Sequence, residues 1–130
     1  MTRSFVMLLA IALLSSCSRS FGNKLTDPDL DVYYEFSEDE NKASALGKYW
    51  KKNGFTGDAH QSIRLTKDKE HYFVQLIASN EKNAGDVSFG EMKLLLDLQD
   101  ELDSVIFNSG MHCQIVICDG QFKPLFNINQ

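Results

Sequence analysis

The spacing of hydrophobic and polar residues predicts two amphipathic helices. In the first, Ala43, Leu46 and Trp50 fall on one face at helical spacing. The second has an apolar stripe behind Ser88 that consists of Leu95, Leu98, Leu102, Val105 and Ile106. Ser37 and Ser88 are each followed three residues later by a glutamate, the pattern of a capping box that starts a helix. We therefore expect helices to begin at these two serines.

Alternation of apolar and polar residues predicts two strands after each helix. The four predicted strands are residues 63–66, 71–78, 113–118 and 122–128. Asp119-Gly120 is expected to form a tight hairpin turn between the last two. Gly54 and Phe55 are expected to end the first helix as a Schellman motif. Val32–Phe36 is a candidate fifth strand at the beginning.

The two halves of this pattern match at a fixed offset of 52 residues (for example 107 − 55). The aligned apolar pairs are Leu46 with Leu98, Trp50 with Leu102, Phe55 with Phe107, Ile63 with Ile115, Leu65 with Ile117, Val74 with Phe126 and Leu76 with Ile128. Chance agreement between amphipathic segments is the alternative explanation. We interpret the match as a tandem helix–strand–strand repeat. It predicts an α+β two-layer sandwich in ferredoxin-like style, with permutation as an option, an antiparallel sheet of four or five strands and both helices on one face.

The first 17 residues have the layout of a secretory signal. Arg3 precedes an apolar run, Phe5–Leu14, which is too short to be a stable membrane span. A buried N-terminal helix is the alternative, but this run has no polar face to meet water. Leu14-Ser15-Ser16-Cys17 resembles the lipobox of bacterial lipoproteins. That resemblance implies that Cys17 receives a lipid anchor and that residues 1–16 are removed as a signal peptide.

The same resemblance gives an expected location. An Asp directly after the lipidated cysteine retains some lipoproteins in the inner membrane, whereas this chain has Ser18. We therefore expect the periplasmic side of the outer membrane. Residues 17–31 show little periodicity and are predicted to form a lipidated tether that reaches up to about 40 Å. Residues 32–130 are predicted to form a single domain.

Charge excludes one class of partner. The net charge of the chain is −5, and removing Arg3 with the signal peptide makes it −6. Nucleic acid binding needs clustered Lys and Arg side chains, so we exclude it. The aromatic content of 11% favours a folded domain over a disordered chain.

No combination of side chains predicts catalysis, a metal site or a cofactor. The five-residue spacing of Cys113 and Cys118 places them on opposite faces of one strand, where we expect one to pack and the other to be partly exposed. It fits neither a disulfide nor a zinc site. The histidines at 60, 71 and 112 show no spacing that predicts a catalytic partner. The acids Glu38–Glu40 are explained by helix capping.

The side of the sheet away from the helices is the candidate interaction surface. It should combine aromatic, aliphatic and hydrogen-bonding side chains, a composition typical of protein interfaces. The candidate residues are Arg64, Phe73, Gln75, Ile77, Gln114 and Val116. The alternatives are an ordinary solvated sheet face or one partly covered by the tether.

These observations favour a non-enzymatic, membrane-anchored lipoprotein whose domain binds another protein of the cell envelope. Such a lipoprotein could be an assembly accessory, or it could be an inhibitor or immunity-type factor. The alternative is a small-molecule-binding or hydrolytic protein with a pocket between sheet and helices. A third hypothesis is a self-associating spacer.

Overall fold

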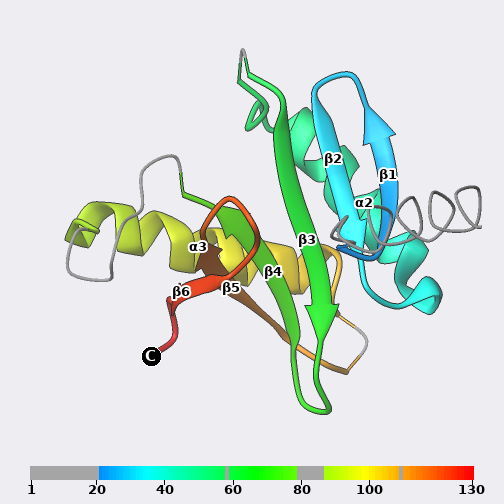
Figure 1. Ribbon diagram of the computed structural model, residues 1–130. Coiled ribbons are helices and arrows are strands. Elements are labelled where there is room, and N and C mark those ends of the chain that lie inside the picture. The colour runs from blue at the N-terminus through cyan, green and yellow to red at the C-terminus, as the bar shows by residue number, and fades with distance from the viewer. Residues whose placement is uncertain (1–20, 58, 79–86, 109) are drawn as a thin grey trace, which may run out of the picture.

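The computed structural model describes residues 21–57, 59–78, 87–108 and 110–130. Within these residues, pairs of consecutive strands alternate with helical segments along the chain (Figure 1). The elements are β1 (Asn23–Asp27), β2 (Leu30–Tyr34), the 3-10 helix η1 (Ser37–Asp39), α2 (Glu40–Lys52), β3 (Gln61–Lys67), β4 (Tyr72–Ile77), α3 (Phe89–Val105), β5 (Cys113–Cys118) and β6 (Pro124–Asn127).

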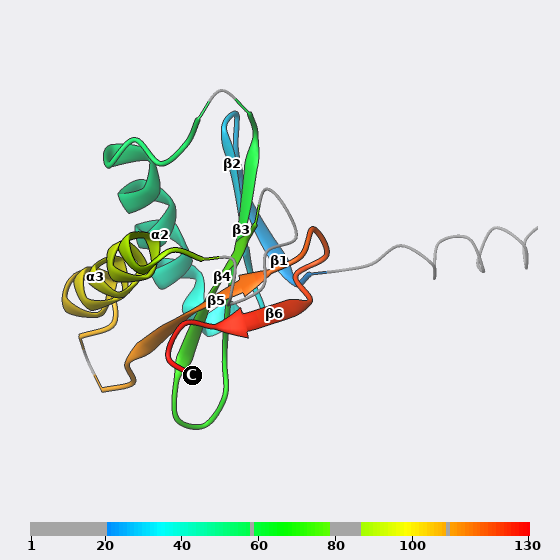
Figure 2. The same ribbon diagram turned by 90° about the vertical axis from the view of Figure 1, so that its left-hand side faces the viewer.

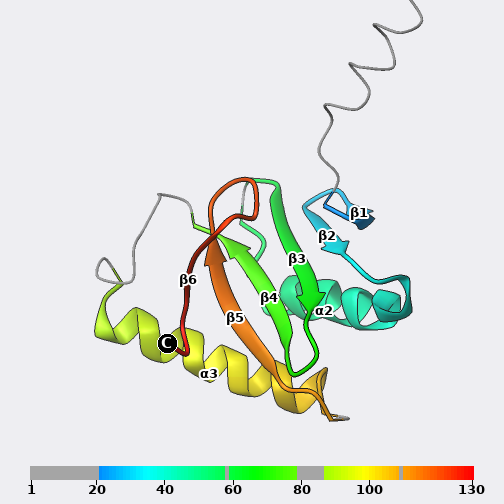
Figure 3. The same cartoon turned by 60° about the horizontal axis from the view of Figure 1, so that its bottom comes forward.

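The six strands form one sheet whose order follows the sequence, from β1 to β6 (Figure 3). Each successive pair β1–β2, β3–β4 and β5–β6 is an antiparallel hairpin. The hairpins join each other through parallel pairs, β2 with β3 and β4 with β5, which are connected by α2 and α3. Parallel crossovers have one strongly preferred hand. Because both crossovers advance in the same direction, α2 and α3 lie on the same face (Figure 2).

The α+β class, the helix–strand–strand order and the single helical face are therefore confirmed. The all-antiparallel sheet of four or five strands and the ferredoxin-like arrangement are wrong. In a ferredoxin-like split βαβ unit another strand lies between the two strands that a helix connects. Here each helix connects strands that are direct neighbours and parallel. Alternation along a strand indicates which side is buried, but it leaves the choice of neighbour open.

The predicted tether at residues 17–31 is also wrong over most of its length. β1 and the start of β2 lie within it, so the folded domain begins before Val32. Leu25 pairs with Val32 in this hairpin, and Leu30 is 1% exposed. The parallel ladder between β2 and β3 ties the hairpin to the rest of the sheet. The predicted signal peptide and Cys17 lie outside the described residues.

The main core fills the space between the sheet and the two helices. Of the pairs aligned by the repeat, Trp50 and Leu102 are both buried, as are Ile63 and Ile115. Phe55 and Phe107 differ, with 40% and 1% of their surface exposed. The repeat therefore holds for the layout of the elements, and less well for the residue just beyond each helix.

Two of the three predicted helix ends are confirmed. Ser88 caps α3 as expected, since its hydroxyl oxygen accepts a hydrogen bond from the amide of Glu91 at 3.1 Å. Gly54 ends α2 with a φ of 71°, and Phe55 donates its amide to Trp50 O at 3.0 Å. The capping box at Ser37 is wrong, because Ser37 lies inside η1 and α2 begins only at Glu40, where Asp39 is the N-cap residue and makes no side-chain cap bond.

Candidate functional site

The six predicted interface residues lie on the face of the sheet that carries no helix. Arg64 on β3 is paired with Gln75 on β4, which is paired in turn with Val116 on β5. In neighbouring rows Phe73 pairs with Gln114, and Ile77 pairs with Cys118. The ladder therefore places residues from three strands side by side on one face of the sheet, with Gln75 and Val116 buried in it. We call these residues the sheet-face patch (Arg64, Phe73, Gln75, Ile77, Gln114 and Val116).

Arg64 is held rigidly within the sheet-face patch. Its Nε donates to Phe21 O at 2.9 Å, and its Nη1 donates to Gln75 Oε1 at 2.9 Å. Its Nη2 lies 3.8 Å from a carboxylate oxygen of Glu35. Gln75 is only 6% exposed, so Arg64 satisfies a side-chain oxygen that would otherwise be buried without a partner.

Aromatic rings cover part of this face. Phe21 packs edge-to-face on Tyr33 and Phe122, with ring centroids 5.4 Å and 5.1 Å apart. Val116 and Cys118 lie buried beneath them in a second hydrophobic cluster. The face is thus partly covered by the residues just before β1, which was one of the alternatives left open by the sequence.

The other part of the face remains hollow. An open hollow of about 380 Å³ lies beside β6, where Phe73 and Val116 provide apolar lining. Asn127 on its border donates from Nδ2 to Gln114 Oε1 at 2.8 Å. The expected tight turn at Asp119-Gly120 is wider than predicted: Asp119 N donates to Lys123 O, and Phe122 takes the left-handed conformation with φ of 59°.

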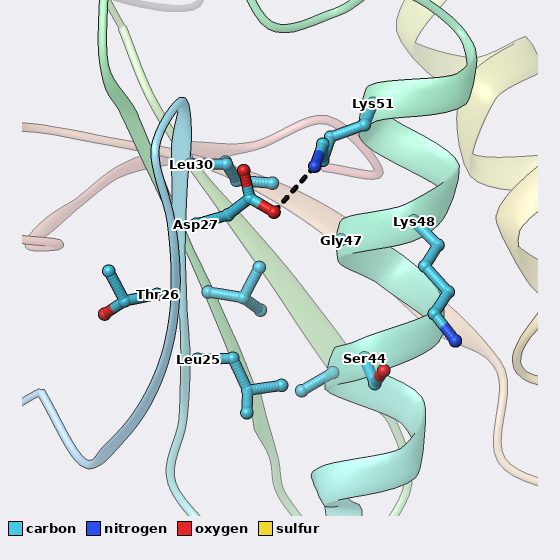
Figure 4. A pocket seen from close by; sticks show the side chains of 10 residues that line it. Leu25, Thr26, Asp27, Leu30, Ser44, Gly47, Lys48 and Lys51 are labelled. Carbon is cyan, nitrogen blue, oxygen red and sulfur yellow. Dashed lines mark hydrogen bonds and ion pairs between the residues drawn. The ribbon is translucent and has the colours of Figure 1, made fainter.

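A second concave site separates β1 from α2 (Figure 4). It has a volume of about 330 Å³, and small residues such as Ser44 and Gly47 keep α2 from filling it. Its apolar lining comprises Leu25, Leu30, Val32 and Ala43. Lys51 spans the mouth to Asp27, with 2.6 Å between Nζ and Oδ2. This hydrogen bond from Lys51 lowers the pKa of Asp27. We call this site the β1–α2 groove.

The β1–α2 groove suits an apolar ligand better than a reaction. Its lining residues within the described part of the chain include neither a histidine nor a cysteine. Its charged pair, Lys51 and Asp27, is already used as an ion pair. The convergent polar groups expected of a hydrolytic pocket are therefore not brought together in this groove.

The side chains of His60 and His112 make local polar contacts. His60 lies between two acceptors, with Nδ1 2.9 Å from Pro28 O and Nε2 3.0 Å from Asp31 Oδ2. The hydrogen bond to Pro28 and the one to Asp31 raise the pKa of His60. The exposed His112 lies 2.9 Å from Asp103. Spacing in the sequence predicted neither pair.

Both described cysteines are buried free thiols. Cys113 faces the helices and is 2% exposed, whereas Cys118 belongs to the second cluster and is 0% exposed. Burial raises the pKa of Cys113 to about 12 and that of Cys118 to about 11. The expectation that one of them is partly exposed is wrong, because the aromatic rings cover the second face at Cys118.

Sequence reasoning missed an exposed apolar surface on α3. Phe89, Leu94 and Val105 are 89%, 70% and 58% exposed. The helical spacing predicts Val105 to lie in the buried stripe of this helix, and that prediction is wrong. The helical spacing predicts an apolar stripe, but the packing of α3 against β5 decides which residues of that stripe are buried.

Within the described residues, no group of three or more His, Cys, Asp or Glu side chains is placed to hold a metal ion. The helices found in those same ranges are not long and apolar enough to cross a membrane.

Comparison with known proteins identifies the domain. No curated protein and no solved structure matches the chain. A family model described as the AF_1994_N family N-terminal domain matches residues 24–130. The match begins at the second residue of β1, so it includes the hairpin that precedes α2. Because the match covers most of the sequence, the chain belongs to the AF_1994_N family through its N-terminal domain.

Proposed function

We propose that the protein is a membrane-anchored bacterial lipoprotein whose domain binds another protein of the cell envelope without catalysis. Cys17 receives the lipid and becomes the N-terminus when residues 1–16 are removed, and the protein lies on the periplasmic side of the outer membrane. The lipobox-like segment Leu14–Cys17 supports the anchor. Several acyl chains on one residue give stable anchoring, where a single chain gives marginal binding.

The sheet-face patch is the proposed contact surface, and its continuity across β3, β4 and β5 is the observation that carries the proposal. Arg64, hydrogen-bonded to Gln75, and the half-buried Phe73, two residues from Gln75 along β4, resemble the rigid Arg and aromatic anchors of protein interfaces. The adjoining hollow of about 380 Å³ gives a partner side chain a place to insert. An assembly accessory and an inhibitor or immunity-type factor would both use such a surface.

Binding is favoured over catalysis by the surroundings of three side chains that could react, Cys113, Cys118 and His60. The thiols of Cys113 and Cys118 are buried and have raised pKa values, which opposes formation of the nucleophilic thiolate. His60 is held between a carbonyl and a carboxylate oxygen at the β1–β2 turn.

Affinity capture from detergent-solubilised native membranes tests this proposal. We would compare the wild-type protein with Phe73→Ala and with Phe89→Ala by quantitative mass spectrometry. Phe89 is the matched control, since it is 89% exposed and lies on α3, away from the patch. We expect a stoichiometric envelope protein with wild type and Phe89→Ala, and at least a tenfold loss with Phe73→Ala. Equal recovery with both variants would exclude the patch, and mass analysis showing an unmodified Cys17 would exclude the anchor.

The β1–α2 groove supports one alternative function, the binding of a small apolar molecule. Its volume of about 330 Å³ is at the lower end of the range for ligand sites. Ser44→Leu adds bulk to the lining, so it should abolish binding of a fluorescent apolar probe. Thr66→Leu, a polar-to-leucine change on β3 outside the groove, is the control.

A further inference from the structure

The chain enters the fold on the helix-free face at a fixed point. The carbonyl of Phe21 accepts a hydrogen bond from Arg64, and its ring packs on Tyr33 and Phe122. The next residue, Gly22, has a φ of 99°, and a Cβ there would lie 2.6 Å from Tyr34 O. Glycine is therefore needed for the sharp turn into β1. These contacts fix where any N-terminal anchor must emerge.

Only a short segment of chain connects this entry point to Cys17. Four residue steps separate Cys17 from Phe21, and a fully extended chain covers about 14 Å in that number of steps. A domain of about 100 residues has a radius of gyration of about 13 Å and is therefore about twice as wide as this gap. A separate globular partner therefore does not fit between the lipid surface and the part of the helix-free face around Phe21, whereas the β6 edge of that face lies further from the entry point.

We propose that the bilayer surface itself faces the helix-free side of the sheet, so that α2 and α3 point away from the membrane. This inference rests on the proposed lipid anchor at Cys17, and its occupant is the layer of lipid headgroups. The β5–β6 loop projects on the same side, opposite the two helices (Figure 2). A protein partner then reaches the sheet-face patch along the membrane plane, from the β6 edge, where the hollow lies.

The charges around the entry point suit an anionic lipid surface. The ammonium group of Lys24 lies over the Tyr33 ring, 5.9 Å from its centroid, and thus on the helix-free side. Lys123 is exposed in the β5–β6 loop next to Phe122, whose ring contacts Phe21. Both lysines therefore border the entry point, and the acid beside it, Glu35, lies 3.8 Å from the guanidinium group of Arg64. Basic residues close to an anionic membrane are attracted to its surface potential.

Quenching by lipid headgroups tests the orientation. The full chain, with lipid on Cys17 verified by mass spectrometry, is placed in phosphatidylcholine and phosphatidylglycerol vesicles that contain a headgroup-nitroxide lipid. A fluorophore is attached at Lys123→Cys or, as the matched control, at Lys93→Cys on the exposed side of α3. We expect at least threefold stronger quenching at position 123. Equal quenching, or stronger quenching at position 93, would overturn the proposed orientation.

A lengthened tether separates the two proposals. Twenty Gly and Ser residues inserted after Ser18 add a flexible span of about 25 Å and should make quenching at the two positions equal. Unchanged quenching at position 123 in this variant would show that the tether does not set the orientation, which would overturn the inference. A chain whose Cys17 carries no lipid would overturn the anchor and the orientation together. A lipidated chain with equal quenching would overturn the orientation alone.

Discussion

The hydroxyl group of Tyr72 on β4 donates a hydrogen bond of 2.8 Å to Oδ1 of Asp39, at the end of η1. Oδ2 of the same carboxylate lies 3.2 Å from Nζ of Lys67 on β3. Lys67 also contacts Glu38 at 2.7 Å, and this hydrogen bond raises the pKa of Lys67. The network fixes the segment before α2 to the sheet, so one buried acid couples three elements.

Removing this acid should destabilise the domain. We expect Asp39→Ala to lower the free energy of unfolding by about 3 kcal/mol, because the Tyr72 hydroxyl and part of the Lys67 charge lose their partner. Glu40→Ala, at an exposed neighbouring acid, should change it by about 0.5 kcal/mol or less. Urea denaturation measures both. Similar values for the two variants would contradict the role assigned to Asp39.

Alkaline pH should weaken the fold through two tyrosines. Burial, and then a hydrogen bond with Glu101, raises the pKa of Tyr49 from 10.0 to about 12. Burial also raises the pKa of Tyr72. The tyrosine hydroxyl loses its proton at a lower pH in the unfolded chain than in the folded one. Its contribution to stability is therefore complete below pH 10 and is lost as the pH rises towards 12. Urea midpoints should fall across this range, and less steeply in Tyr49→Phe. An identical slope in that variant would contradict the assignment.

His60 should titrate above its ordinary pKa of 6.5. Its two ring nitrogens face Pro28 O and Asp31 Oδ2, so the doubly protonated ring satisfies both acceptors. The stability from this contact is complete below pH 6.5 and is lost as the pH rises through the folded-state pKa. Proton NMR of the ring measures the midpoint, which should be lower in Asp31→Asn. A wild-type midpoint at or below 6.5 would rule out this description.

Gly22→Ala should destabilise the chain at the entry to β1. The added Cβ would lie 2.6 Å from Tyr34 O at a φ of 99°, so we expect a loss of about 2 kcal/mol or more. Gly90→Ala is the control, because no atom lies within 4 Å of its added Cβ. The control should leave stability unchanged or raise it by about 0.5 kcal/mol, since alanine favours the helix. Thermal unfolding of the two variants measures the difference. Equal stability of Gly22→Ala and Gly90→Ala would show that the turn does not require glycine at position 22.

The native thiols should resist modification. Cys113 and Cys118 are buried, and their raised pKa values of about 12 and about 11 keep them protonated near pH 8. In a Cys17→Ala background, Ellman's reagent should react with them only after unfolding. The same background with Lys123→Cys should react at once with one equivalent, because that position is exposed. Fast reaction of the background protein would show that the buried positions open readily.

The sequence predicted those features that depend on neighbouring residues. The period of apolar positions located α2 and α3, and the cap at Ser88 was identified from a spacing of three residues. The end of α2 was also predicted, because the left-handed glycine at Gly54 and the return of Phe55 onto Trp50 are local events. The placement of the sheet-face patch followed from alternation, since successive side chains of a strand point to opposite faces.

Only the tertiary structure decided which elements meet. The parallel pairing of β2 with β3 and of β4 with β5 joins segments separated by a helix, and no local pattern selects that neighbour. For the same reason Asp39 was assigned to a helix cap, although its partner Tyr72 is 33 residues away. β1 was missed, and β2 at Leu30–Tyr34 was only a candidate strand placed at Val32–Phe36, because the burial of this hairpin depends on β3 being beside it. Local periodicity determined the helices, most of the strands and the faces they bury, whereas long-range packing decided the pairing of the strands and the partners of the buried polar groups.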